Sequence, residues 1–408
     1  MQNQTTPYTR ADALIAVLLA LLTMLLSVGL LDADQPTMSD DYAAYMSEGI
    51  AIAEGTLAEQ TQLNALLHPS TRTFGGADGA QADEPLVYVW GLPLILAGVY
   101  RAVGFDRPTG WALVWYKLPG VFFLAMAAVC AYLLYRRRFS KTVSALLTAV
   151  LCWGSEIVRD SARITTDIPC LAVSLLALLL VEVLLAAKTK RGRAAAGTAL
   201  GAALWFDCAV RLNGKTVLFM ALLAHIVGLW QSGTRGRALL LHLLPYAVCA
   251  ALTAGFARLF PSATSNMSDV GSTTPAQVGR NIAYYEGILN DWFYRMMPFG
   301  PGAMTYPAHI GVYLLAFWGM VKWGGRGNLH AALLVLGSFA VLYLLPYVQS
   351  VRYLYNALPF MLMFAAYGAR EAVRRIQNGR AQRLARAACF TALAFLAVGT
   401  AQNTAGLV

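Results

Sequence analysis

The feature that most limits how this chain can fold is a succession of long apolar runs separated by short polar segments. The 408 residues are 58% hydrophobic and only 13% charged, whereas an average soluble domain has roughly 25% charged residues. A segment that crosses a membrane needs ~20 apolar residues and must satisfy its backbone hydrogen bonds internally, which a helix does. The sequence therefore predicts an all-α polytopic membrane protein.

Eleven of these runs are long enough to cross a membrane. The run at 11–31 follows a single arginine and ends without a small-residue cleavage pattern, so we interpret it as a transmembrane helix and not as a signal peptide. The expected spans lie near residues 11–31, 112–135, 142–158, 168–187, 194–210, 214–230, 238–260, 306–321, 329–348, 353–369 and 387–402.

The positions of the charged residues decide how a twelfth apolar stretch, 86–104, is interpreted. If this stretch does not cross the membrane and the N-terminus is inside, the basic loops all lie on the cytoplasmic side, as the positive-inside rule requires. All acidic residues except Asp12, Glu182 and Glu371 then lie outside or in outer halves of spans. We therefore expect 86–104 to form an interfacial or re-entrant helix on the outer face. The basic loops are 136–141, 188–193, 231–237, 322–328 and 370–386.

Two of the expected outer loops are long. The first, 32–111, begins with the stretch "PTMSDDYAAYMSEG" and contains an amphipathic pattern from about Asp41 to Thr56. The second, 261–305, contains a helical stretch from Ala276 to Met297 that is rich in aromatic residues. Such residues favour the membrane surface, so we expect this helix to lie along it.

Ionisable residues gather at the expected outer ends of the helices. Charged groups at membrane depth are costly, so their positions indicate function. A carboxylate near a hydroxyl can act as a general base, and Arg or Lys groups in a poorly hydrated cleft can hold a departing phosphate. The combination predicts group transfer from a lipid-phosphate donor at the outer interface. These residues are Asp40, Asp41, Lys117, Arg159, Asp160, Arg163, Asp167, Asp207, Arg211, Lys215, Arg352 and Tyr353.

Five segments, taken in chain order, resemble elements of the GT-C superfamily of membrane glycosyltransferases, which use polyprenyl- or dolichyl-phosphate sugars. The resemblance implies the GT-C fold, with juxtamembrane helices in the first outer loop, and is greatest to the protein-O-mannosyltransferase and aminoarabinose-transferase type. The segments are "SDDYAAYMSEGIAIAEG", "PLVYVWGLPLILAGVYRAVGF", "YKLPGVFFLAMAAVCAYLLYRRRF", "RDSARITTDIPCLAVSLLALLL" and "VRYLYNALPF".

The resemblance also implies roles for three carboxylates. Asp40, the first acid of the pair, corresponds to the catalytic base, and Asp41 to a supporting carboxylate. Asp167 corresponds to the acid of the second outer loop. Each residue also has a structural interpretation, because aspartate at a helix N-terminus caps free backbone amides.

For the donor phosphate, the resemblance implies contacts from Arg163 and Arg352. Lys117 stands where the family has Arg, which keeps the charge but loses the bidentate fork. Arg211 and Tyr353 are further candidates for this phosphate site. We expect no metal site and no required cofactor, although a divalent cation could bind the paired carboxylates.

These expectations define a catalytic transmembrane module over 1–230 and a variable C-terminal module over 231–408. The expected partners are a polyprenyl-phosphate sugar donor, a glycan, lipid or protein acceptor, and membrane lipids, with no nucleic acid. No glycine-rich phosphate loop or βαβ pattern indicates a nucleotide-sugar donor. The expected location is a bacterial inner membrane, with the active site on the outer face.

Two alternatives remain open at the level of sequence. A transporter or flippase for a lipid-linked or anionic solute could use the same outer charges as a binding vestibule, although few ionisable residues lie at mid-span. A lipid-linked glycan polymerase or ligase also has many spans and long outer loops. The sugar, the acceptor and the oligomeric state are not encoded in any motif that we recognise.

Overall fold

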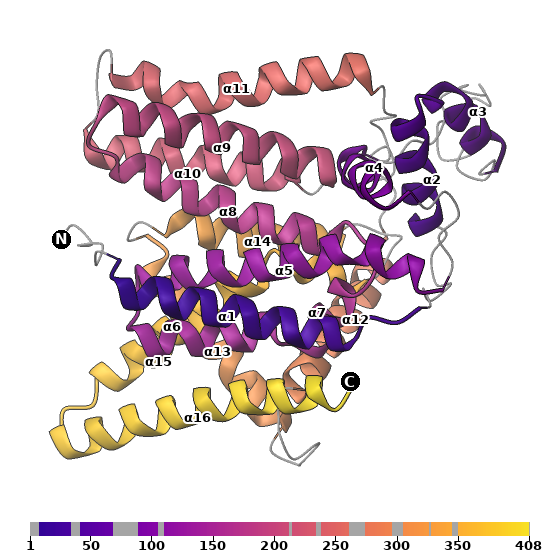
Figure 1. Ribbon diagram of the computed structural model, residues 1–408. Coiled ribbons are helices and arrows are strands. Elements are labelled where there is room, and N and C mark those ends of the chain that lie inside the picture. The colour runs from indigo at the N-terminus through magenta and orange to yellow at the C-terminus, as the bar shows by residue number, and fades with distance from the viewer. Residues whose placement is uncertain are drawn as a thin grey trace.

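The computed structural model consists of helices over the residues that it describes, and this confirms the all-α prediction. Most of the long helices lie roughly side by side across Figure 1. The described residues are 8–33, 41–67, 89–104, 110–211, 214–233, 238–260, 274–295, 305–325, 328–344 and 350–407.

The first half of the chain supplies the centre of the bundle. In α8 (Asp167–Ala186) and α5 (Ala112–Arg136), 72% and 67% of the residues of an apolar 18-residue stretch are buried. The share is only 17–33% in α1 (Arg10–Gly29), α10 (Gly214–Ser232), α11 (Ala238–Leu259) and α16 (Gly379–Ala405). The sequence of α8 is apolar on nearly all sides, which is typical of a helix surrounded by others. The helices that the first half of the chain contributes to the bundle are α1 (Arg10–Gly29), α5 (Ala112–Arg136), α6 (Lys141–Cys152), α8 (Asp167–Ala186), α9 (Lys190–Val210), α10 (Gly214–Ser232) and α11 (Ala238–Leu259).

The expected span at 142–158 is broken in two, which differs from the prediction of one continuous helix. After α6, the short helix α7 (Ser155–Ser161) leaves at an angle of 65°. The break falls at Gly154, whose backbone is extended and where an added Cβ would lie 3.3 Å from the indole nitrogen of Trp292. Asp160 belongs to α7 and therefore lies after this bend.

Three helices of the first long loop gather at the right-hand end of the bundle in Figure 1: α2 (Asp41–Glu54), α3 (Leu57–Leu67) and α4 (Gly91–Val103). The helix predicted from Asp41 is therefore confirmed, whereas the predicted separation of polar from apolar residues is not, because Glu48 is buried as Tyr45 is. The 13 residues of α4 reach ~20 Å at 1.5 Å per residue, which is shorter than a ~30 Å hydrocarbon core. This length agrees with the prediction that 86–104 does not cross the membrane.

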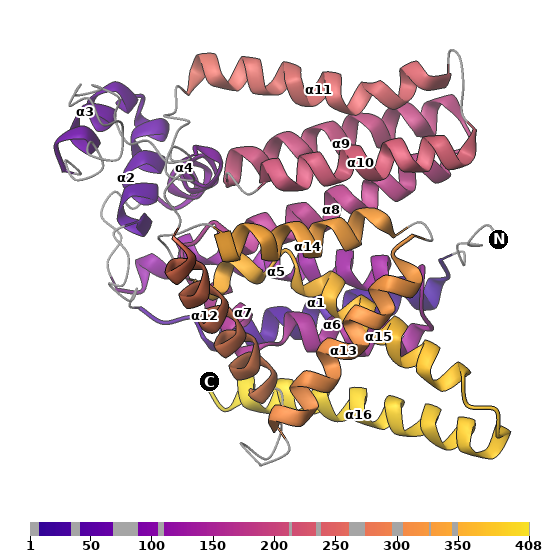
Figure 2. The same ribbon diagram turned by 180° about the vertical axis from the view of Figure 1, so that it is seen from behind.

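The helices of the C-terminal part lie against one side of this centre, in front of it in Figure 2. The tightest crossing among them joins α13 and α15, where a Cβ added to Gly319 would overlap the carbonyl oxygen of Phe364, and one added to Gly368 would overlap that of Leu315. The elements are α12 (Pro275–Tyr294), α13 (Thr305–Trp323), α14 (Leu329–Leu344), the 3-10 helix η3 (Val351–Leu354), α15 (Leu358–Arg374) and α16 (Gly379–Ala405).

Among the described residues, six helices are long and apolar enough to cross a membrane, or seven if α6 and α7 form one bent span. The other predicted spans correspond to α9, α13, α14 and α15, which are shorter or less apolar by the same measure. The chain is thus a multi-pass membrane protein, and the predicted total of eleven spans includes these four helices.

The described parts of the basic segments that were expected to share one side of the membrane lie at one end of the bundle. The C-terminal ends of α5, α8, α10 and α15 are together at the left in Figure 1. There, Arg138 donates to Glu182 at 2.5 Å and to Asn328 at 3.0 Å, and Arg370 donates to the carbonyl of Arg138 at 3.3 Å. The helices of the first loop are at the opposite end.

Candidate functional site

At the end of the bundle near α2 and α4, three predicted site residues from separate elements meet. Asp167 begins α8, and its side chain is only 1% exposed. Its carboxylate accepts hydrogen bonds from Arg211, which follows α9, and from Arg352 of η3 at 3.2 Å. Tyr353, also predicted, places its ring 5.2 Å from the Arg211 guanidinium. The structure therefore brings together four of the eight predicted residues.

The two guanidinium groups are oriented by further contacts. Arg211 donates to Thr166 Oγ1 at 3.1 Å, and Arg352 donates through Nε to Ser350 Oγ at 3.2 Å. Burial is the largest effect and lowers the pKa of each arginine, but Asp167 and the other nearby groups that favour the charged form together outweigh it, so both pKa values are raised. The two positive charges of Arg211 and Arg352 thus face the one negative charge of Asp167, so these three side chains together carry an excess positive charge.

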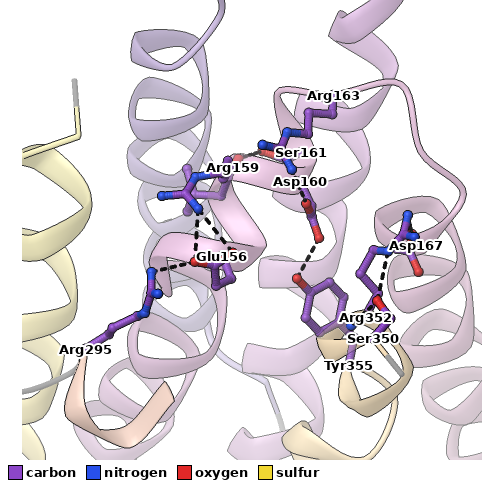
Figure 3. A network of polar contacts seen from close by, with 11 residues as sticks. Glu156, Arg159, Asp160, Ser161, Arg163, Asp167, Arg295, Ser350, Arg352 and Tyr355 are labelled. Carbon is purple, nitrogen blue, oxygen red and sulfur yellow. Dashed lines mark hydrogen bonds and ion pairs between the residues drawn. The ribbon is translucent and has the colours of Figure 1, made fainter. Parts of the chain in front are cut away.

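Arg163 belongs to the same polar network through a different carboxylate. Its guanidinium donates to Asp160 at 3.4 Å, and the Tyr355 hydroxyl donates to the other Asp160 oxygen at 2.7 Å (Figure 3). Asp160 is close enough to Asp167 and Arg352 to interact electrostatically with both. The predicted phosphate partners Arg163 and Arg352 thus lie on either side of a buried acid that was not among the predicted site residues.

Lys117 has a partner that the motif comparison did not identify. Its side chain is fully buried, and its ammonium group bonds to the backbone oxygen of Asp32 at 2.9 Å and to the Asp32 carboxylate at 2.5 Å. Asp32, Arg159 and Arg163 line a cavity of about 470 Å³. The only sequence signal for Asp32 was its position as the first acid after the apolar run at 11–31.

The predicted base and its neighbour fall largely outside the residues that the structure describes. Asp40 lies outside the described residues, and Asp41 is described only as the first residue of α2. One helical turn later, Tyr45 is close enough to Arg211 for an electrostatic interaction. The N-terminal part of α2 therefore lies beside the Asp167 and Arg211 pair.

A second polar cluster joins the second long loop to α7 near this site. Arg295 and Arg159 donate to Glu156 at 2.6 Å and 3.1 Å (Figure 3). Arg295 also donates to Asp291 at 3.0 Å. The spacing of Glu156 and Arg159 could have indicated their pairing, but nothing local predicts Arg295. Within the described ranges, no group of three or more His, Cys, Asp and Glu side chains is placed to hold a metal ion.

The described part of the chain is a multi-pass, all-helical membrane protein with a cluster of charged residues at one end of its bundle, as predicted. The chain is similar to ArnT from Cupriavidus metallidurans. Its apo structure gives a TM-score of 0.55 and the structure bound to undecaprenyl phosphate 0.57; in each comparison the identity is 13%, over 98% of this chain and 77% of ArnT. No family model matches the sequence, and no curated protein matches it. At this identity the likeness establishes the fold.

Proposed function

We propose that this chain is a membrane glycosyltransferase that moves a sugar from a polyprenyl-phosphate donor to an acceptor at the outer face of the membrane. The observation that carries the proposal is the meeting of Arg211 and Arg352 at one buried carboxylate, Asp167, beside the start of α2. The shared fold with ArnT, which binds undecaprenyl phosphate in one of its structures, supports a lipid-phosphate donor.

The arginine pair has the chemistry that a departing lipid phosphate requires. A guanidinium carries five N–H donors, and Asp167 accepts from one nitrogen of each arginine. The remaining donors suit phosphate oxygens, which guanidinium groups bind by charge-assisted, often bidentate, hydrogen bonds. Because Asp167 orients both groups before the donor binds, little reorganisation is needed when charge develops on the phosphate.

The lipid part of such a donor also has a surface to occupy. Between α4 and α5 lies a groove of about 860 Å³ with an almost entirely apolar lining, which includes Val99, Trp115 and Phe122. An isoprenoid chain lying in this groove would enter from the bilayer at the end of the bundle that carries the arginines. The groove supports a lipid-linked donor more than a soluble one.

The proposed reaction is a single displacement with inversion at the anomeric carbon. Asp40 takes the proton of the acceptor hydroxyl, whose oxygen then attacks that carbon. The bond from the carbon to the phosphate oxygen breaks, and the electron pair leaves with the lipid phosphate. Arg352 and Arg163 stabilise the phosphate, while Arg211, Lys117 and Tyr353 are the further candidates for this contact. Asp41 supports the base.

Under this proposal the arginines neutralise the phosphate and no metal ion is needed. Turnover should then persist in excess EDTA. Turnover that stops with EDTA and returns with a divalent cation would instead assign the paired carboxylates Asp40 and Asp41 to a metal site.

The decisive experiment uses the purified full chain, reconstituted in proteoliposomes with a panel of radiolabelled polyprenyl-phosphate monosaccharides. We expect one donor to be consumed with release of polyprenyl phosphate, and Asp40→Asn to abolish this consumption while leaving donor binding largely intact. The matched control is Glu59→Gln, an exposed carboxylate of α3 in the same loop. Near-normal turnover by Asp40→Asn removes Asp40 from the role of base.

The same preparation distinguishes the alternatives that the sequence left open. A flippase or transporter would move a labelled lipid-linked sugar across the bilayer without breaking its phosphate bond. A polymerase or ligase would act on lipid-linked oligosaccharides and leave every monosaccharide donor intact.

A further inference from the structure

A basic aromatic patch lies at the other end of the bundle, where α13 and α15 end. We define it by Trp318, Lys322, Trp323, Arg370, Arg374 and Arg375. The Arg375 guanidinium lies 4.6 Å from the Trp318 ring centre, and the Lys322 ammonium lies 5.2 Å from the same ring. One indole thus holds cations from two helices side by side.

Deeper in the patch, an arginine is held by stacked rings. Trp323 and Tyr367 stack at 4.8 Å with only 10° between their planes, and Arg370 lies 4.4 Å and 4.8 Å from their centres. Nε of Arg370 is buried and has no hydrogen-bond partner among the described residues. The guanidinium is therefore fixed in place by aromatic contacts while part of its bonding capacity is unused.

The patch has more positive charge than its neighbours neutralise. Glu371, the acid closest to it in the chain, pairs with Arg375 at 3.9 Å. The other described carboxylates at this end are already paired, Glu182 with Arg137 and Arg138 at 3.3 Å and 2.5 Å, and Asp12 with Arg136 at 2.7 Å. An anionic group from outside the chain would complete the charge balance.

An apolar stripe leads from the hydrocarbon region directly to these cations. On α13, Leu314, Phe317 and Val321 are 64%, 61% and 60% exposed, and their spacing places them on one face of the helix. Trp318 and Lys322 follow on the same face, one position after Phe317 and Val321. The surface therefore matches a molecule with a long apolar chain and an anionic head.

We propose that the basic aromatic patch binds the phosphodiester headgroup of an anionic glycerophospholipid, with an acyl chain along Leu314, Phe317 and Val321. This lipid is separate from the proposed sugar donor. The 17 residues of α15 extend ~25 Å at 1.5 Å per residue between the patch and the segment that contains Arg352. The two sites therefore face opposite leaflets, and this proposal does not rest on the proposed reaction.

The test is native mass spectrometry of the purified full chain, delipidated in detergent and titrated with phosphatidylglycerol or phosphatidylcholine. We expect preferential binding of phosphatidylglycerol. The double variant Lys322→Gln/Arg375→Gln should weaken that binding about 30-fold, which corresponds to two cations near an anionic headgroup. Arg383→Gln/Arg386→Gln, which removes the same charge from exposed positions of α16, should bind like the unmodified chain.

A second variant keeps every charge and removes the ring that organises the cations. Trp318→Leu should also weaken phosphatidylglycerol binding, although less than the double variant. Equal lipid binding by the Lys322→Gln/Arg375→Gln chain and the unmodified chain overturns the proposal. An equal loss of phosphatidylglycerol binding in the α16 control overturns it as well, because net charge alone would then explain the binding. Displacement of phosphatidylglycerol by equimolar undecaprenyl phosphate also overturns it.

Discussion

Replacing Asp167 by asparagine removes the charge that two arginines share. The Asp167 side chain is 1% exposed, and those of Arg211 and Arg352 are 16% and 31% exposed. Loss of one partner from a buried ion pair costs about 3–5 kcal/mol, because the remaining charge stays buried without compensation. Since both guanidinium groups keep some access to water, we expect a cost near the lower end, about 3 kcal/mol.

The matched control for this change is Asp291→Asn. Asp291 is also bonded to an arginine, Arg295, at 3.0 Å, but its side chain is 52% exposed. Exposed ion pairs contribute about 0–1 kcal/mol. Equilibrium unfolding of the three proteins in mixed micelles, followed by tryptophan fluorescence, should therefore separate the two variants by at least about 2 kcal/mol. Equal stability of the two variants would refute the argument that Asp167 is a buried counter-charge.

A double-mutant cycle isolates the contact itself. Arg211→Gln should destabilise the unmodified chain, but it should cost less in the Asp167→Asn background, where it removes an uncompensated guanidinium. Coupled neighbours give interaction free energies of about 0.5–3 kcal/mol. Additive effects of the two substitutions would show that the pair is not coupled in the folded protein.

Two further predictions concern the donor site and the packing of the bundle. Arg352→Ala should weaken binding of the polyprenyl-phosphate donor more than binding of the acceptor, because the guanidinium is proposed to contact the phosphate; equal losses in titrations of the two substrates would contradict that contact. Gly319→Ala should destabilise the protein by about 1–3 kcal/mol, since the added methyl group overlaps the Phe364 carbonyl oxygen and overpacks the crossing of α13 and α15. The control in the same unfolding assay is Gly311→Ala on α13, which should be neutral or stabilising because the new Cβ has no neighbouring atom within 4 Å. If Gly319→Ala destabilised the protein no more than this control, the close crossing would be disproved.

Much of the architecture could be predicted because it follows from local composition. The helix that begins at Asp41 and the short helix within 86–104 were both expected from hydropathy and charge along the chain. The break at Gly154 was not, because an apolar run looks the same whether its helix is straight or bent. At the bend, Gly154 lies against Trp292, which comes from a distant helix.

The candidate site, too, was only partly predictable from the sequence. Motif order identified Asp167, Arg163 and Arg352 as important residues, but their partners came from the structure. Asp160 and Tyr355, which are 195 positions apart, form a hydrogen bond of 2.7 Å that no local pattern predicts. Roles for Asp40 and Asp41 remain predictions from the motif, since the proposed base lies outside the described residues.

By itself, the sequence determined that the chain is a multi-pass helical membrane protein and which charged residues stand at the ends of its helices. These properties follow from the cost of burying backbone and charge in a bilayer, which each segment meets alone. Only the tertiary structure decided that Lys117 pairs with Asp32 and that Arg211 and Arg352 share Asp167. Such pairings depend on the packing of helices far apart in the chain, which brings together groups that no local sequence pattern connects.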